Sequence, residues 1–248
     1  MLSVRFIACK TVVADISRGS MQTIIFDLDG TLADTSGDLI WAANACFRGL
    51  GHGDLLDPAA DQLTAFHGGR AMLRLGFSRL NTGAGEAEVD AQFPLLLHHY
   101  AAHIDGFTRL YGGVADALAR LQARGVPMGV CTNKPEGLAE TLLGRLGIRH
   151  YFGAMLGADT LAVRKPDPEH LFETIRRLGG APDRAVLIGD TATDRDTARA
   201  ANVPCVLVTF GPEGRGVERM QPEGLLDHYD QLEQVLDGLS RPLGQGSG

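Results

Sequence analysis

Residues Ile24–Leu32 read IIFDLDGTL, an apolar run that ends in two carboxylates separated by one residue. Like charges this close repel each other, and moving either out of water is costly unless an opposite charge compensates it. The stretch therefore predicts a buried strand that delivers Asp27 and Asp29 to a site with its own source of positive charge.

The overall composition favours a globular protein with a small-molecule ligand. The chain has 248 residues, of which 44% are hydrophobic, enough for one large core and a smaller second domain. Its net charge of −7 gives no basic surface for nucleic acid or an anionic membrane, so we expect neither as a partner. We expect a monomer or a homodimer.

The cysteine pattern and the absence of long apolar runs indicate a cytoplasmic protein. No run approaches the roughly 18 apolar residues that predict a membrane-spanning helix. The four cysteines are far apart and form no CxxC pair, so the sequence predicts neither a zinc module nor a disulfide framework. Reduced thiols of a cytoplasmic protein are the plain interpretation.

Short apolar runs alternate with helical patterns from Met21 onward. The apolar runs are continuous and occupy residues 23–27, 126–132, 185–190 and 203–210. Patterns with Leu and Ala at helical spacing, each ending in Gly, occupy residues 114–125, 136–147 and 170–180. Continuous apolar strands are typical of a parallel sheet covered on both faces. The alternation predicts an α/β fold with a doubly wound, mostly parallel sheet.

One interval, residues 35–106, breaks this alternation. It has no strong strand pattern, only helical stretches such as 37–51 and 90–104 separated by Gly-rich loops. An unstructured loop of this length is improbable inside a compact domain. We therefore predict an inserted helical cap over 35–106, placed over the paired carboxylates, and an α/β core formed by residues 21–34 and 107–240.

The two ends of the chain carry weaker signals. Residues 1–20 contain a short apolar stretch interrupted by charges, and we treat them as a poorly specified N-terminal extension, with a start at Met21 as one interpretation. An added edge strand over residues 4–8 is the alternative. Residues 241–248 are Gly-rich, which predicts a mobile tail.

Polar residues follow the apolar runs at the places where strands of the predicted sheet end. In open parallel sheets, ligands bind beyond the carboxyl ends of the strands, so these residues should converge at one site. The candidates, including a lysine from a loop, are Asp27, Asp29, Thr132, Asn133, Lys134, Lys165, Asp190 and Asp194.

These segments, in their order and spacing, resemble the four motifs of the haloacid dehalogenase superfamily over about residues 21–210. The segments are DLDGT, the Thr-Asn of CTNKP, the Lys of RKPDP, and GDTATD. The insert resembles the helical cap of the phosphoglycolate-phosphatase-like members. The resemblance implies a Rossmann-like core and a Mg²⁺-dependent phosphomonoesterase for a small phosphate ester, with 2-phosphoglycolate as the leading candidate.

The resemblance also implies a division of work between the two carboxylates. Asp27 would attack phosphorus and form an aspartyl-phosphate, and Asp29 would act as the acid and then as the base. Mg²⁺ would be held by Asp27, the backbone carbonyl of Asp29, and Asp190. Lys165 would neutralise charge on Asp27 and on the phosphoryl group.

The resemblance also implies roles in phosphate binding and in positioning Lys165 for three further residues. Thr132 and Asn133, before a predicted helix, would hold phosphate oxygens together with Lys165. Asp194 would orient Lys165 or a metal-bound water, although it could instead only cap the helix, and Asp196 could serve in its place.

Residues of the predicted cap give less specific signals. His67 and Arg70 could contact substrate, and Arg70 could bind a substrate carboxylate, with an exposed loop arginine as the equal alternative. His98, His99 and His103 have no acidic partner at a convincing sequence spacing and are expected on the surface or in packing. Trp41 is expected in the cap core. Lys134, before Pro135, is left out of the catalytic set.

Other functions share this set of residues. A sugar phosphomutase or a nucleotide or pyrophosphate phosphatase would keep the phosphoenzyme chemistry. A dehalogenase is a weaker alternative, because Asp29 would have no proton to deliver to a halide. A phosphate-binding module without turnover is a remote alternative from another class.

Overall fold

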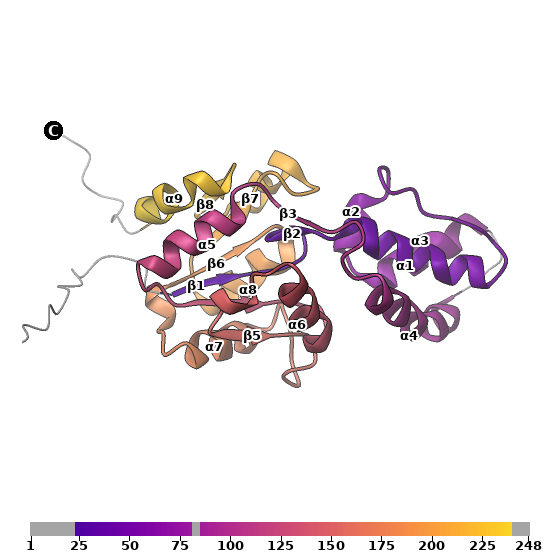
Figure 1. The fold of residues 1–248 in the computed structure, drawn as a ribbon, viewed down its shortest axis with the longest axis horizontal. Coiled ribbons are helices and arrows are strands. Elements are labelled where there is room, and N and C mark those ends of the chain that lie inside the picture. Colours follow the sequence, from indigo (N-terminus) through magenta and orange to yellow (C-terminus); the bar gives the residue numbers. More distant parts are fainter. Residues whose placement is uncertain (1–22, 81–84, 240–248) are drawn as a thin grey trace, which may run out of the picture.

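The computed structural model describes residues 23–80 and 85–239, which form an α/β body and a helical lobe beside it (Figure 1). The expectations for residues 1–20, including the edge strand at 4–8, and for the tail 241–248 lie outside the described residues. No helix in the described ranges is long and apolar enough to cross a membrane.

A six-stranded parallel sheet forms the centre of the body. Its strand order is β5-β4-β1-β6-β7-β8, which places the strand of the opening motif in the interior. The strands are β1 Thr23–Phe26, β4 Met128–Cys131, β5 Ala154–Leu156, β6 Ala185–Gly189, β7 Cys205–Val208 and β8 Gly224–Leu226. The predicted doubly wound, mostly parallel sheet is confirmed. Edge strands β5 and β8 were not predicted, because three residues carry too little pattern.

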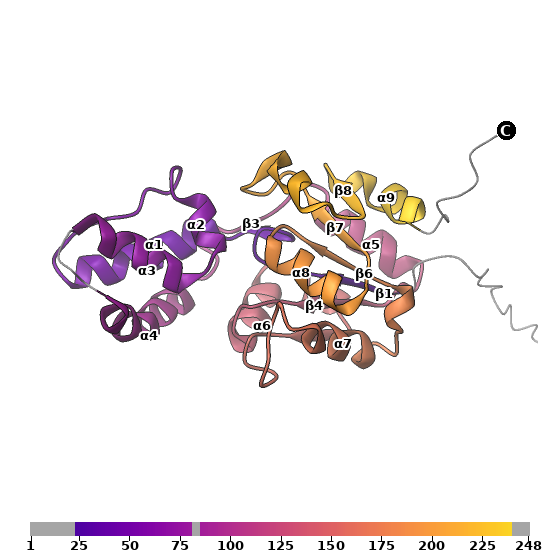
Figure 2. The same cartoon turned by 180° about the vertical axis from the view of Figure 1, so that it is seen from behind.

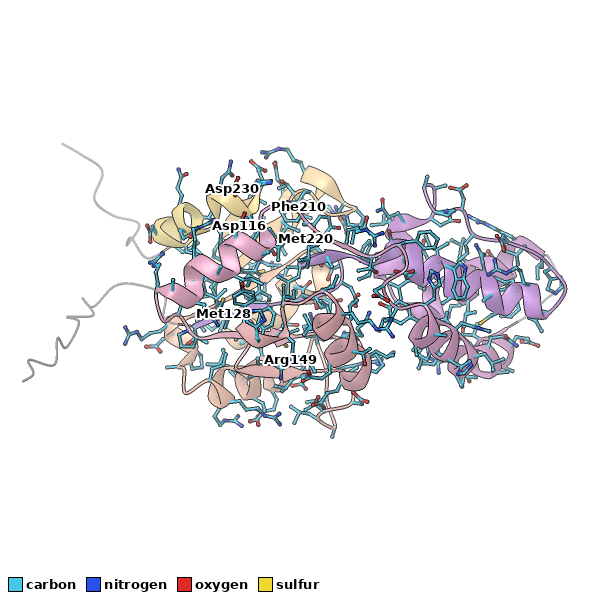
Figure 3. All side chains as sticks on the ribbon, in the orientation of Figure 1. Asp116, Met128, Arg149, Phe210, Met220 and Asp230 are labelled. Carbon is cyan, nitrogen blue, oxygen red and sulfur yellow. The ribbon has the colours of Figure 1, made fainter. Side chains whose placement is uncertain are left out.

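Helices cover both faces of the sheet because successive strand side chains point in opposite directions. Ile24 and Phe26 of β1 pack into the core on the side of α5, α6 and α9, whereas Ile25 packs into a second core with α7 and α8. Met128 of β4 lies among the side chains that fill the space between the layers (Figure 3). These helices are α5 Val114–Ala123, α6 Glu136–Arg145, α7 Pro168–Arg177, α8 Ala192–Ala201 and α9 Leu232–Leu239. Short 3₁₀ turns occupy Arg149–Tyr151, Pro182–Arg184, Gly214–Met220 and Tyr229–Gln231.

Four helices form the lobe beyond the carboxyl end of β1 (Figure 2). They are α1 Ser36–Gly49, α2 Gln62–Phe66, α3 Gly69–Leu80 and α4 Glu86–Ala102. In its core, Phe47 packs edge to face on Phe77, and a Cβ at Gly76 would lie 2.1 Å from the Phe47 ring. Glycine therefore allows α3 to approach α1 this closely. The exact cap boundaries at residues 35 and 106 stay a prediction.

The chain crosses between body and lobe through two short strands, β2 Ala33–Asp34 and β3 Arg109–Leu110, which pair antiparallel. Beside this crossing, the buried carboxylate of Asp38 accepts hydrogen bonds from the backbone amides of Phe107 and Thr108 and from the Thr108 hydroxyl. His103 Nδ1 lies 2.7 Å from Asp38 Oδ1. The expectation that His103 has no acidic partner was wrong. Sequence spacing could not reveal this partner, because 65 residues separate His103 from Asp38.

Candidate active site

The carboxyl ends of three neighbouring strands bring the predicted site together. Asp27 follows β1, Thr132 follows β4 and Asp190 follows β6, while Lys165 comes from the loop before α7. β1 lies between β4 and β6, so these side chains meet over the middle of the sheet. Asp27, Thr132 and Lys165 line a cavity of about 340 Å³ that also has walls from the helical lobe. This volume lies within the range of small-molecule sites.

Asp27 lies at the floor of the cavity and is 8% exposed. Lys165 Nζ is 3.0 Å from Asp27 Oδ1, but this oxygen is buried and accepts no hydrogen bond from the described residues. Burial, together with the charges of Asp194 and Asp29, raises the pKa of Asp27 to about 6 even though the charge of Lys165 opposes the shift. Asp27 Oδ1 is therefore ion-paired with Lys165 but accepts no hydrogen bond from the described residues.

Lys165 is held in place by Asp194, which is fully buried. Lys165 Nζ donates to Asp194 Oδ1 at 2.6 Å. Asp194 Oδ2 accepts from the Thr191 amide and hydroxyl at the start of α8. Burial opposes protonation of Lys165, but the charges of Asp194 and Asp27 raise its pKa above the ordinary value. Asp194 thus both caps α8 and orients Lys165, whereas Asp196 pairs with Arg199 in an exposed position.

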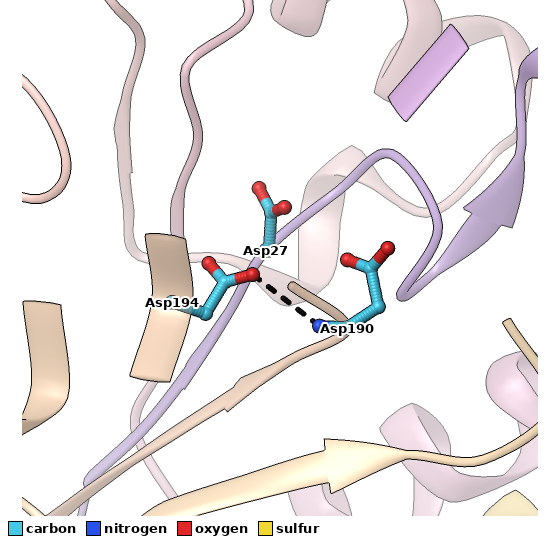
Figure 4. Close-up of side chains that lie close together, drawn as sticks. All are labelled: Asp27, Asp190 and Asp194. Carbon is cyan, nitrogen blue, oxygen red and sulfur yellow. Dashed lines mark hydrogen bonds between the residues drawn. The ribbon is translucent and has the colours of Figure 1, made fainter. Parts of the chain in front are cut away.

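Asp190 is the third carboxylate of the group, and Figure 4 shows it beside Asp27 and Asp194. Thr31 Oγ1 donates to Asp190 Oδ1 at 3.0 Å. Burial, with the charges of Asp194 and Asp27, raises the pKa of Asp190 well above its usual range. A Cβ at Gly30, whose φ is +81°, would lie 2.1 Å from Asp190 Oδ2, so only glycine fits between these loops.

The cluster of three carboxylates is suited to bind a divalent cation. Single oxygens of Asp27, Asp190 and Asp194 lie within 4.8 Å of one another. Both Asp194 oxygens accept hydrogen bonds, so Asp27 and Asp190 are the side chains suited to bind the ion. Three carboxylates against the charge of Lys165 leave an excess of two negative charges when all are ionised. Mg²⁺ has the matching charge and prefers oxygen ligands.

Asp29 lies on the same cavity wall and has a partner that the sequence interpretation left out. Lys134 Nζ donates to Asp29 Oδ1 at 2.7 Å and to Oδ2 at 2.9 Å, and the Thr35 hydroxyl donates to Oδ1. The Lys134 side chain is only 3% exposed. Burial alone would lower the pKa of Lys134, but the charge of Asp29 raises it above its ordinary value. No local pattern around Lys134 signalled this, because Asp29 is 105 residues away.

Thr132 and Asn133 both line the cavity, with different bonding. Thr132 Oγ1 accepts from the Lys134 amide at 3.2 Å, which leaves its hydroxyl hydrogen available to a ligand. Asn133 Nδ2 donates to the backbone carbonyl of Lys165 at 2.9 Å. Asn133 therefore ties the loop of Lys165 to the end of β4.

The two predicted cap contacts lie in different surroundings. His67 lines the cavity, next to Gly68. Arg70 is not among the described residues that line it, and its guanidinium donates to Asp90 and lies over the Phe93 ring. This geometry gives no support to a contact between Arg70 and a substrate carboxylate.

Comparison with known proteins agrees with this geometry. The family model described as haloacid dehalogenase-like hydrolase matches residues 24–208. A phosphoglycolate phosphatase from Mesorhizobium japonicum is 41% identical over 219 residues, covering 88% of this chain and 95% of that protein. A phosphoglycolate phosphatase from Agrobacterium fabrum is 37% identical over 222 residues, covering 89% and 94%.

The fold is also similar to that of solved structures. The crystal structure of a predicted phosphoglycolate phosphatase from Haemophilus somnus has a TM-score of 0.75 to this chain at 24% identity, covering 87% of this chain and 97% of that one. This likeness concerns the fold, and the family follows from the sequence matches. The resemblance stated from the motifs is confirmed, and the chain belongs to the haloacid dehalogenase-like hydrolases.

Proposed function

We propose that this chain is a Mg²⁺-dependent phosphomonoesterase that hydrolyses 2-phosphoglycolate to glycolate and phosphate. The names of the relatives at 41% and 37% identity support the substrate. The observation that carries the chemistry is the carboxylate of Asp27, a residue of the cavity wall, whose buried Oδ1 lies 3.0 Å from Lys165 Nζ and accepts no hydrogen bond from the described residues. A carboxylate held in this way can act as a nucleophile.

The first half of the reaction forms an aspartyl-phosphate. One oxygen of Asp27 attacks phosphorus, the phosphorus–oxygen bond of the ester breaks, and the leaving oxygen takes a proton from Asp29. In the structure Asp29 accepts from Lys134 and Thr35, an arrangement suited to its ionised form. Asp29 must therefore bind a proton before it can act as the acid.

The second half releases phosphate. Asp29, now ionised, accepts a proton from a water molecule as that water attacks phosphorus, and the bond to Asp27 breaks. Lys165 stabilises the negative charge that gathers on the phosphoryl oxygens, with Thr132 as a further donor. When bound to Asp27, Asp190 and the backbone carbonyl of Asp29, Mg²⁺ would neutralise part of the same charge.

The test is phosphate release by the purified full chain with Mg²⁺. The substrates are 2-phosphoglycolate, sugar phosphates, nucleoside monophosphates and pyrophosphate. We expect 2-phosphoglycolate to have the highest kcat/KM, EDTA to abolish turnover and added Mg²⁺ to restore it. Full activity in EDTA would contradict the metal assignment.

Other outcomes identify the competing functions. A requirement for a bisphosphate activator, with phosphoryl return to a sugar, would make the chain a phosphomutase. Preference for nucleotides or pyrophosphate would assign it to that class. Binding of phosphate analogues without hydrolysis of any ester would make it a binding module.

The predicted partners and location extend this proposal. We propose a small phosphate ester as the ligand, a monomer or homodimer as the state in solution, and the cytoplasm as the location. Sedimentation of the purified chain tests the oligomeric state.

A further inference from the structure

A second residue of the cavity wall has a buried polar atom that makes no hydrogen bond with the described residues. Among the described residues, two buried side-chain oxygens or nitrogens make no hydrogen bond, Asp27 Oδ1 and Tyr100 Oη. Both residues line the same cavity, and Tyr100 is 1% exposed on α4 of the helical lobe. The mechanism uses Asp27 but gives no role to the Tyr100 hydroxyl. Burial raises the pKa of Tyr100 to about 12, so at neutral pH the hydroxyl is protonated and can donate.

Lys134 lies between this hydroxyl-bearing ring and the catalytic carboxylates. Its Nζ is 4.4 Å from the centroid of the Tyr100 ring and donates to both oxygens of Asp29. An ammonium group has three N–H donors, so one remains after the two bonds to Asp29. Lys134 can therefore donate to a ligand while it still holds Asp29.

The rest of the lobe-side wall is largely apolar. Leu39, Phe93, Leu96 and Leu97 all line the cavity. Among the described lining residues the lysines are Lys134 and Lys165, and no arginine is present. Lys165 is engaged with Asp27 and Asp194. A second anionic group on a ligand would therefore find its charge partner at Lys134.

We infer that Lys134 and Tyr100 form the subsite for the carboxylate of the leaving group, Lys134 through its ammonium charge and Tyr100 through its hydroxyl. This inference rests on the proposed function, because it assigns the part of the substrate that distinguishes 2-phosphoglycolate from simple alkyl phosphates. Lys134 and Tyr100 are specificity residues here, one from the α/β body and one from the lobe. Arg70, which pairs with Asp90, takes no part.

The experiment compares 2-phosphoglycolate with ethyl phosphate, which has a methyl group in place of the carboxylate. The measured quantity is the ratio of their kcat/KM values in each variant. Tyr100→Phe removes only the hydroxyl and should lower this ratio by about 10–100-fold, the range of one hydrogen bond to a charged group. Lys134→Gln removes the charge and should lower the ratio by about 10–100-fold.

A merely structural role gives a different result. If Lys134 only positions Asp29, Lys134→Gln will slow both esters equally and leave the ratio unchanged, which overturns the inference. A fall in the ratio for Arg70→Gln but not for Tyr100→Phe also overturns it. Arg74→Gln is the matched control, since Arg74 is an exposed cation of α3 that pairs with Glu86 outside the cavity.

Inhibition provides a measurement that does not depend on turnover of 2-phosphoglycolate. The probes are 3-phosphonopropionate, which keeps the carboxylate, and propylphosphonate, which lacks it. We expect wild-type protein to bind the first more tightly, and Tyr100→Phe to reduce this preference even if Lys134→Gln does not fold. Wild-type protein that hydrolyses other esters but not 2-phosphoglycolate would refute the proposed function. Equal inhibition by the two probes would refute the subsite.

Discussion

Asp27, Asp190 and Asp194 place three carboxylates beside Lys165 at the end of the central strands. Asp194 is fully hydrogen-bonded, but Asp27 Oδ1 has no hydrogen-bond partner. In the metal-free protein the ionised form of Asp27 is destabilising even with Lys165 3.0 Å away, because burial and the neighbouring carboxylates raise the pKa of Asp27. Ionisation of all three carboxylates leaves an excess of negative charge that suits a divalent cation, and this cation would offset the charge of a bound phosphate. The charge on Asp27 that the proposed reaction needs therefore lowers the stability of the metal-free fold.

Asp27→Asn tests both sides of this conflict. Turnover should fall by more than about 10³-fold, because an amide is a poor nucleophile. In EDTA at pH 7.5 the variant should melt at a higher temperature than wild type. The pKa of Asp27 is raised from 3.8 to about 6 in the fold, so its ionisation destabilises the native state above pH 6. The difference in Tm should therefore shrink as the pH falls from 6 to 4.

The comparison uses thermal melts of both proteins across this pH range, with circular dichroism to verify the fold. Asp196→Asn is a control, because Asp196 is an exposed carboxylate on the neighbouring helix α8. A lower Tm for Asp27→Asn than for wild type in EDTA would show that the buried charge is compensated within the protein.

In the helical lobe, the side chain of Asn44 makes the backbone hydrogen bonds that fix an irregular segment between two helices. Between α1 and α2 the chain runs through residues 50–61 without a helix or strand. Asn44 of α1 fixes this segment: its Oδ1 accepts from the amides of Leu55 and Leu56, and its Nδ2 donates to the Leu56 carbonyl. Asn44 is 4% exposed, so these bonds are shielded from water.

Asn44→Ala should lower the free energy of unfolding by about 1–3 kcal/mol, because it leaves buried backbone groups without partners. Urea denaturation monitored by circular dichroism measures this. Ser78→Ala in α3 is a matched control: its hydroxyl also bonds a backbone carbonyl, but in an exposed position, so its effect should stay within about 0.5 kcal/mol. Equal losses in the two variants would contradict the role given to Asn44.

Within the described residues, the whole molecule consists of two bodies joined where β2 pairs with β3. The cavity has walls from both, with Asp27 and Lys134 from one and Tyr100 from the other. Asp38 holds the joint, because its carboxylate in α1 binds the returning chain at Phe107 and Thr108. The β2–β3 pair and the hydrogen bonds of Asp38 therefore determine how the lobe is oriented toward Asp27 and Asp29.

Asp38→Ala should loosen this joint. Its loss leaves the buried amide of Thr108 and the part-buried amide of Phe107 without their acceptor, so Tm should fall and limited proteolysis should cut residues 103–108 faster. Because the cavity has walls from both bodies, kcat and KM should change together. Asp105→Ala is a nearby control, since Asp105 pairs with Arg145 at the surface. Unchanged proteolysis at 103–108 in Asp38→Ala would exclude the proposed role of the joint.

Much of the molecule could be predicted from local patterns. The apolar runs at 23–27, 126–132, 185–190 and 203–210 correspond to β1, β4, β6 and β7, and the motif residues Asp27 and Asp190 follow two of them. These signals are local because strand burial, helix spacing and the residues at strand ends are properties of short segments. Strands β5 and β8 escaped prediction because they are short edge strands.

Local sequence patterns were sufficient to predict the parallel sheet, the helical insert and the buried carboxylates that meet Lys165. Only the tertiary structure brought Lys134 to Asp29, Tyr100 to Lys134 and His103 to Asp38, and turned Arg70 toward Asp90. The physical reason is that each of these contacts joins segments far apart in sequence. Which charges meet across such a distance depends on how the lobe packs and sits on the body, and no local spacing encodes that.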